Sequence, residues 1–298
     1  MSEPTPDPAS GQSPAANNAS AKKPDPPRPP FAWQPFTPKG IAAFAGATFG
    51  RLFIVQVVVA LLAAGAVVWF LSAVWFPGVE EAIRNVSGDG AVRAGHLDIT
   101  GQMTERLVTN RFLTFAIDTQ SQKAHAYSAD VFVVLRSGYY EVCSLFGCRT
   151  FRYPVQSTAF NRLELEARWG AWKPFLLGIA AVVVIFSLLF SWWLLATIYF
   201  LFVRTFAFFA DREVTFGGSW RLCGAALLAG AVLLIAGVVG YGFGVVDVVR
   251  LLLIAVLHVI APWVLIIFAT RALPRVTAKI PKNPFASTVT PDQQKPVG

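Results

Sequence analysis

Charged side chains are scarce in this sequence. Asp, Glu, Lys and Arg make up 14% of the 298 residues, hydrophobic residues make up 55%, and the mean hydropathy is +0.54. A water-soluble domain carries charge on about a quarter of its residues, so this composition excludes an ordinary soluble protein. We therefore expect an integral membrane protein.

Catalytic motifs are also lacking. The sequence has no phosphate-binding loop with its lysine, and no serine stands in the setting of a nucleophile elbow. Outside the apolar stretches, the candidates for acid–base or metal chemistry are His96, Asp98, Asp118, His125 and Asp130, whose spacing follows no metal or catalytic pattern. Each has a simpler interpretation as a turn, strand-end or surface residue. We expect no enzyme, no metal site and no cofactor.

Four long apolar stretches are present, at residues 52–76, 174–203, 222–246 and 251–269. Because a bilayer core of about 30 Å needs roughly 20 apolar residues in a helix, each is long enough to cross a membrane. No short apolar segment with a small-residue cleavage site precedes the first stretch, which predicts a signal anchor there. Trp69, Trp75 and Phe76 are placed to mark the outer boundary of that helix.

The net charge of +8 reflects membrane topology. It is not gathered into the basic, aromatic-interleaved stripe of a nucleic-acid site. Basic residues instead flank the apolar stretches on one side of the membrane: Lys39, Arg51, Arg204, Arg212, Arg221, Arg271, Arg275, Lys279 and Lys282. Positive charge stays in the cytoplasm, so we expect both termini there, in a multi-pass protein of a bacterial inner membrane. Its expected partners are the lipid bilayer and other membrane or periplasmic proteins or a second copy, with no nucleic acid.

These boundaries divide the chain into five parts. Residues 1–38 are expected to form a disordered, Pro-rich cytoplasmic tail, in which residues 24–30 either offer a polyproline II helix to an SH3-like partner or are a solvated extension. Residues 39–76 should hold an interfacial helix and the first transmembrane helix, and residues 77–173 an extracytoplasmic domain. Residues 174–271 should hold transmembrane helices two to four, and residues 272–298 a second cytoplasmic tail.

The interfacial helix is predicted from its start signal. Thr37 can cap the helix and Pro38 suits its first position, with Ile41, Phe44, Ala45 and Thr48 following on one face. We expect this face to lie on the inner leaflet. The short aromatic loop 204–221 is expected to lie along the same inner surface.

The part between the first two apolar stretches reads as a folded α+β domain. Alternating runs at residues 96–100, 112–118, 130–136, 139–145 and 148–153 predict the strands of a small antiparallel sheet, with 112–118 buried on both faces. A helix follows, capped by Ser157 or Thr158 and carrying the pairs Arg162–Glu166 and Glu164–Arg168. The predicted fold class is a helical membrane protein with four transmembrane helices and a small α+β extracytoplasmic domain between the first two.

Cys143 and Cys148 enclose a short connection between two predicted strands. In an oxidising periplasm, a disulfide that closes the hairpin fits this spacing best. Half of a metal site is the alternative, although the sequence has no second Cys pair. Cys223 is expected to be a free thiol.

Inside the apolar stretches, His258 and Gln56 are the candidate polar sites. Pro262 removes the helical hydrogen bond to the carbonyl of His258, so a bend there could present a polar point to a cavity. Gly230, Gly237, Gly240 and Gly244 predict a stripe on which a neighbouring helix packs closely. We expect a non-enzymatic protein that displays a recognition, sensor or assembly domain. The alternative is a small transporter or transporter subunit that uses these residues.

The chain resembles a family of polytopic bacterial inner-membrane proteins that is grouped as a domain of unknown function. Some of its members are labelled maltodextrin-utilisation membrane proteins. The resemblance rests on short pieces: residues 35–39 before the first apolar stretch, the Gly-rich turn into 89–99, residues 112–119 ending in Ile-Asp-Thr, the strand 130–135, and Arg221-Leu222. It implies the membrane architecture described above and no specific activity. The Cys143–Cys148 hairpin and the Pro-rich tail are not part of the resemblance.

Overall fold

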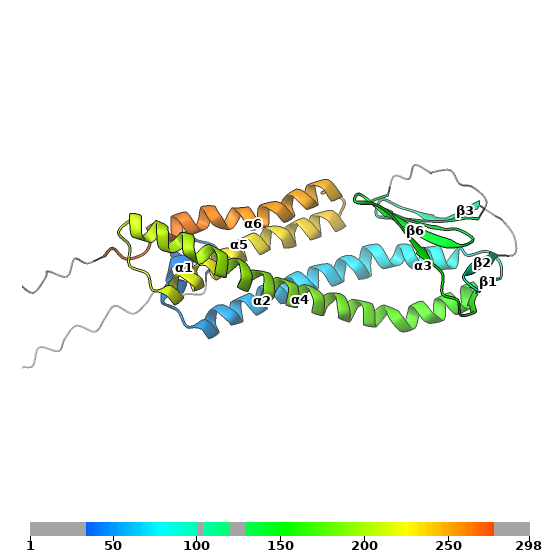
Figure 1. Ribbon diagram of the computed structural model, residues 1–298, viewed down its shortest axis with the longest axis horizontal. Coiled ribbons are helices and arrows are strands. Elements are labelled where there is room, and N and C mark those ends of the chain that lie inside the picture. Colours follow the sequence, from blue (N-terminus) through cyan, green and yellow to red (C-terminus); the bar gives the residue numbers. More distant parts are fainter. Residues whose placement is uncertain (1–33, 100–103, 120–128, 277–298) are drawn as a thin grey trace, which may run out of the picture.

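A computed structural model describes residues 34–99, 104–119 and 129–276. Nearly all of the two predicted tails, and His125, therefore lie outside the described residues. Within them the molecule is long: a bundle of helices occupies one end and two small sheets the other (Figure 1). We call the first the tail end, where the described residues begin and end, and the second the β end.

Four helices are long and apolar enough to cross a membrane. The first runs through α2 (Phe49–Phe70), a π-helical turn η2 (Leu71–Trp75) and α3 (Phe76–Arg84), and the others are α4 (Arg162–Phe209), α5 (Phe216–Gly242) and α6 (Val248–Arg271). In its most apolar window α5 is 56% buried, whereas α4 is 6% buried. Thus α5 is the centre around which the bundle packs, and α4 lies at its periphery. The coarse prediction of a helical protein with four membrane-length helices and a small β region is confirmed.

Two of these helices extend well beyond the predicted boundaries. The first does not end at Phe76 but continues through the π-helical turn to Arg84. The predicted short helix after residue 157 and the second apolar stretch are a single helix of 48 residues, about 72 Å long, with Pro174 inside it. Proline has no N–H to donate, so the carbonyl of Gly170, one turn earlier, loses its helical hydrogen bond while the helix continues. The loop predicted at 204–221 is shorter in the structure and spans residues 210–215, because α4 continues to Phe209 and α5 begins at Phe216.

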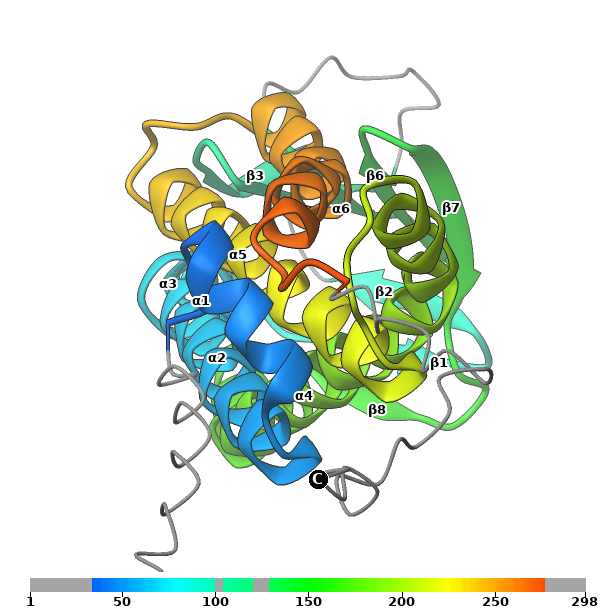
Figure 2. The ribbon, with the colours of Figure 1, turned by 90° about the vertical axis from the view of Figure 1, so that its left-hand side faces the viewer.

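The predicted interfacial helix forms, and its apolar face packs against the helix bundle. The Thr37 hydroxyl accepts a hydrogen bond from the N–H of Gly40 and begins α1 (Pro38–Ala43), which continues into the 3-10 turn η1 (Phe44–Gly46). Ile41 and Phe44 are completely buried in the core of the bundle. Figure 2, which looks onto the tail end, shows α1 lying across it. Its apolar face covers the ends of α5 and α6, because burial there removes it from water as fully as lipid would.

Two sheets form the β end. One has the order β2 (His96–Ile99), β1 (Gly90–Arg93) and β8 (Thr158–Phe160). The other has the order β3 (Thr104–Thr109), β4 (Leu113–Asp118), β5 (Val131–Leu135), β6 (Tyr139–Ser144) and β7 (Gly147–Arg152). The larger sheet packs on α3 through a core of Ala82, Val86, Leu107, Val108 and Ile117. The central strand β4 is buried on both faces, as the sequence predicted.

The β region departs from the prediction in three respects. The one predicted sheet is two, since the strand predicted at 96–100 is β2 of the smaller sheet. The larger sheet is not fully antiparallel, because β4 and β5 run parallel, with Leu113 opposite Val131. Residues 157–160 do not begin a helix: Thr158–Phe160 pairs with β1, and Asn161 caps α4 by accepting the N–H of Glu164. Thr158 pairs with β1 in the smaller sheet because that edge of β1 would otherwise have no hydrogen-bonding partner. The predicted pairs Arg162–Glu166 and Glu164–Arg168 are present at 2.8 and 3.9 Å.

Candidate functional sites at the two ends of the bundle

The acid–base candidates of the sequence are scattered. Asp118, which is 1% exposed, lies at the far end of β4 and is 3.5 Å from the guanidinium of Arg136. Asp130 lies at the opposite end of the neighbouring strand, about 20 Å away at the strand rise. His96 and Asp98 belong to the other sheet. Among the described residues these side chains form no common site.

Arg111 joins the larger sheet to the helices. It precedes β4 and donates two hydrogen bonds of 2.6 Å, to the carbonyl oxygens of Gly244 and Val246 in the turn between α5 and α6. Gly244 has a φ of +76°, and an added Cβ there would meet the Arg111 guanidinium at 2.8 Å. The carbonyls of Gly244 and Val246 lie beyond the last turn of α5, and the Arg111 guanidinium donates a charge-assisted hydrogen bond to each.

A second set of contacts lies beside Arg111. The hydroxyl of Tyr241 in α5 donates to the carboxylate of Asp130 at 2.7 Å, and the N–H of Asp130 donates to the Arg111 carbonyl at 3.0 Å. The ring of Phe112 packs against those of Phe70 in α2 and Tyr241, at centroid distances of 5.7 and 5.0 Å. We call Phe70, Arg111, Phe112, Asp130 and Tyr241 the junction. It ties the sheet to two helices that are distant in sequence.

The helices α3 and α4 form a stalk beside the junction. Glu80 accepts hydrogen bonds from the ammonium of Lys173 at 2.7 Å and from the indole of Trp169 at 3.4 Å, and Phe76 packs edge-on against Trp169. These residues lie beyond the apolar parts of the two helices. The hydrogen bond from Lys173 lowers the pKa of Glu80 below its usual value, because it stabilises the charged carboxylate.

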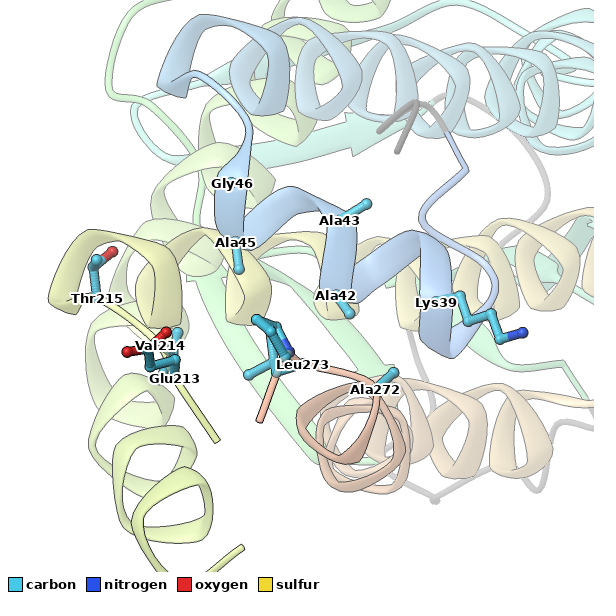
Figure 3. A pocket seen from close by; sticks show the side chains of 11 residues that line it. Lys39, Ala42, Ala43, Ala45, Gly46, Glu213, Val214, Thr215, Ala272 and Leu273 are labelled. Carbon is cyan, nitrogen blue, oxygen red and sulfur yellow. The ribbon is translucent and has the colours of Figure 1, made fainter. Parts of the chain in front are cut away.

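The tail end contains a cavity of about 880 Å³ (Figure 3). Small and apolar side chains from α1, η1, the 210–215 loop and the segment after α6 line it: Ala42, Ala43, Ala45, Gly46, Val214, Thr215, Ala272, Leu273 and Pro274. Lys39 and Glu213 add one charge of each sign. A cavity of this size with few polar groups suits a mostly apolar ligand or side chain.

Arginines hold the walls of this cavity. Arg221 in α5 donates to the carbonyls of Phe44 and Ala45, and Arg212 donates to the carbonyl of Leu273 at 2.6 Å. The 210–215 loop also pairs with the segment after α6, where Glu213 donates its N–H to Pro274 and Val276 donates to Asp211. Two of the basic residues that predict topology, Arg212 and Arg221, therefore also hold the tail end together.

His258 lies where three helices meet. Its Nδ1 is 2.7 Å from the carbonyl of Ala255, one turn earlier in α6. One residue on, the carbonyl of Val259 accepts a hydrogen bond from the Tyr199 hydroxyl in α4 at 3.2 Å. A Cβ added to Gly230 of α5 would collide with the carbonyl of His258. His258 lines neither the tail-end cavity nor a smaller cavity of about 350 Å³ between α3 and α4 beside Glu80 and Lys173.

The predicted glycine stripe serves two purposes. Gly230 and Gly237 face α6, where the neighbours of Gly237 are Ile254 and Leu251. Gly240 and Gly244 instead shape the end of α5, because the carbonyl of Gly240 accepts the N–H groups of Val245 and Val246. Gln56 is 6% exposed, and its amide lies against Gly224 of α5, between helices.

Cys143 and Cys148 form a disulfide between β6 and β7. They are directly opposite each other in the strand register. A carboxylate oxygen of Glu141 lies within 4.8 Å of the two sulfurs, so these three groups could bind a metal only if the disulfide were reduced. Cys223 is a free, buried thiol.

The sequence did not point to the junction. Arg111 is one arginine in a loop, and Tyr241 is one aromatic residue in an apolar helix, more than a hundred residues away. One local signal was present, because Asn is typical of turns. The side chain of Asn110 accepts hydrogen bonds from the N–H groups of Phe112 and Leu113, and Arg111 lies within the turn that these bonds form before β4.

Comparisons with protein-family models, with curated proteins and with solved structures find no match to this chain. Function is therefore argued from the geometry of these sites.

Proposed function

We propose that the protein is a non-enzymatic component of a bacterial inner membrane. Its α+β domain lies outside the cytoplasm and recognises a membrane or periplasmic partner, as a sensor or assembly module. The β end is then extracytoplasmic and the tail end cytoplasmic, in keeping with the basic residues gathered at the tail end. The family resemblance noted in the sequence implies the same membrane architecture.

The observation that carries this proposal is the way the α+β domain is attached. It is not held on flexible linkers: α3 and the first turns of α4 are continuous with apolar helices, and Arg111 binds the turn between the other two. A displacement of the sheet must therefore move all four helices. Those helices converge at the tail end on α1 and the cavity, which supports a route from an outer partner to an inner ligand.

The surface that we expect to meet the partner is β7. Every residue of this edge strand is exposed, so its backbone is open to pairing with an extended segment. Arg149 and Arg152 lie on opposite faces of the strand and favour a partner with acidic side chains.

The coupling is testable with one label. Cys223 is buried and the other two cysteines are oxidised, so Ala42→Cys adds a single reactive thiol, and it lines the cavity. With an environment-sensitive fluorophore there, Arg111→Ala is expected to shift the emission, whereas Arg93→Ala, at an exposed arginine of β1, is not. Identical emission spectra for the two variants would contradict a coupling between the two ends, and therefore the sensor role.

A transporter is the second candidate, because His258 and the bend-forming Pro262 lie deep in an apolar helix. The packing of the His258 carbonyl against Gly230 gives a structural reason for this arrangement without transport. Substrate-dependent flux in proteoliposomes that depends on the His258 imidazole would favour transport over the proposed role.

A further inference from the structure

The hairpin of β6 and β7 ends in two exposed apolar side chains. Leu145 and Phe146 form its two-residue turn and are 54% and 83% exposed. Such turns usually hold Asn, Asp or Gly, which suit water and the required backbone angles. Burial of an exposed Phe side chain stabilises a protein by about 1.5–3 kcal/mol. The isolated chain does not gain this free energy at Phe146, whereas contact of the turn with an apolar partner would provide it.

The strand register places this turn level with the end of α5. Ser144, just before the turn, lies opposite Val131 of β5, whose N–H donates to the carbonyl of Phe112. Phe112 in turn packs on Tyr241 near the end of α5. Two strand spacings separate β6 from β4, so the turn lies about 10 Å to the side of the junction. Figure 1 shows the larger sheet beside the end of the α5–α6 pair.

Other apolar side chains are exposed at the same level. Phe243 and Val245, in the turn after α5, are 70% and 74% exposed, and the ring of Phe243 packs on Trp69 of α2 at 5.0 Å. Leu145 and Phe146 therefore lie level with Phe243 and Val245, and the four exposed side chains form one apolar rim at this end of the helices. Aromatic side chains at such a rim are typical of the boundary between a bilayer and water.

We propose that the Leu145–Phe146 turn inserts into the outer leaflet of the lipid bilayer. The α+β domain is then held at two places, by the junction to the helices and by this hairpin tip to the membrane, which restrains its tilt. The Cys143–Cys148 disulfide lies directly behind the turn, so it keeps the two strands paired where they enter the headgroup region. The inference does not depend on what the domain recognises.

Photo-crosslinking in vesicles tests the insertion. The full chain, carrying benzoylphenylalanine at position 146, 243 or 151, is reconstituted in vesicles of phosphatidylethanolamine and phosphatidylglycerol and irradiated. Phe243 lies on the rim and is the positive control. Phe151 is also exposed but lies four residues along β7 from Gly147, about 13 Å from the turn, and is the matched negative control.

Phospholipid adducts, detected by mass spectrometry, are expected at positions 146 and 243 and at least several-fold less at 151. A lipid yield at 146 as low as at 151, while 243 labels lipid, would overturn the proposal. Adducts at 146 to protein, including a second copy, in place of lipid would overturn it equally. An intact disulfide in each variant shows that the hairpin has formed.

Discussion

The carbonyl oxygen of His258 in α6 lies against the Cα of Gly230 in α5, so closely that no side chain fits between them. Pro262, four residues further on, has no N–H to donate to this carbonyl. The carbonyl left without a helical donor in one helix and the missing side chain in the other thus form a single packing unit. Tyr199 of α4 bonds the next carbonyl, that of Val259, so the third helix joins at the same level.

Gly230→Ala is expected to destabilise the protein by about 1–3 kcal/mol, because the new methyl group must push apart two helix backbones. The measurement is the free energy of unfolding in bicelles. Gly65→Ala is the matched control: Gly65 is also in a long helix, but an added Cβ there meets no atom within 4 Å, so the change should be neutral or stabilising by up to about 1 kcal/mol. Equal effects of the two substitutions would contradict this account of the packing.

Arg111→Ala should loosen the sheet from the α5–α6 turn. It removes two charge-assisted hydrogen bonds to carbonyls, and the expected loss is about 2 kcal/mol. Hydrogen exchange should increase in residues 240–248 and in β4, and Arg93→Ala should leave both unchanged. Unaltered exchange in 240–248 would show that Arg111 does not hold the turn.

Tyr241→Phe tests the other half of the junction. The ring stays, so its packing on Phe112 is kept, but the Asp130 carboxylate loses the hydroxyl donor. We expect a loss of about 1–3 kcal/mol, since a hydrogen bond to a charged acceptor is removed. With Asp130→Asn in the background, the effect should shrink, and full additivity in this double-mutant cycle would exclude a direct interaction.

Replacing both Cys143 and Cys148 with Ser should destabilise the β6–β7 hairpin by about 2 kcal/mol, because a loop that short gains that much entropy when opened. Hydrogen exchange in β6 and β7 should rise, with α5 and α6 unaffected. A reducing agent should reproduce the effect in the native chain and add nothing in the double variant. A further change on reduction of the double variant would point to another cause.

The Glu80–Lys173 pair should make stability depend on pH in the acid range. The pKa of Glu80 is lowered in the folded protein, so the unfolded chain binds a proton more readily. The pair therefore stabilises at neutral pH, and that contribution is lost as the pH falls through the lowered pKa. Both side chains are about one-third exposed, so Glu80→Gln should cost less than about 1 kcal/mol.

The check is unfolding of the native chain and of Glu80→Gln at about pH 7 and about pH 3. The difference between them should be present at the higher pH and smaller at the lower one. A difference that grows on acidification would reverse the sign of the pKa shift and contradict the assigned pair.

Much of the local structure follows from the sequence. Run length alone identified the four apolar helices, because a bilayer core demands about 20 apolar residues. Period-two alternation located most of the strands, and Thr37-Pro38 predicted the start of α1. The spacing of Cys143 and Cys148 indicated a hairpin bridge, since residues on either side of a short turn face each other.

The continuity of the helices required the tertiary structure. Pro174 reads as a start signal, but α3 packs beside α4 on the far side of it, and this contact keeps the helix intact through the proline. The parallel pairing of β4 and β5 was likewise hidden, because strand direction depends on the path of the connection and not on the strand residues.

Apolar run length and alternation can be read along the chain, because they depend on neighbouring residues alone. Three contacts could not be read in this way: Ile41 and Phe44 cover the end of the bundle, Gly230 meets His258, and Arg111 and Asp130 hold the sheet to α5 and the turn after it. Each of these joins residues far apart in the chain. Their meeting depends on how the helices pack, and no local pattern records it.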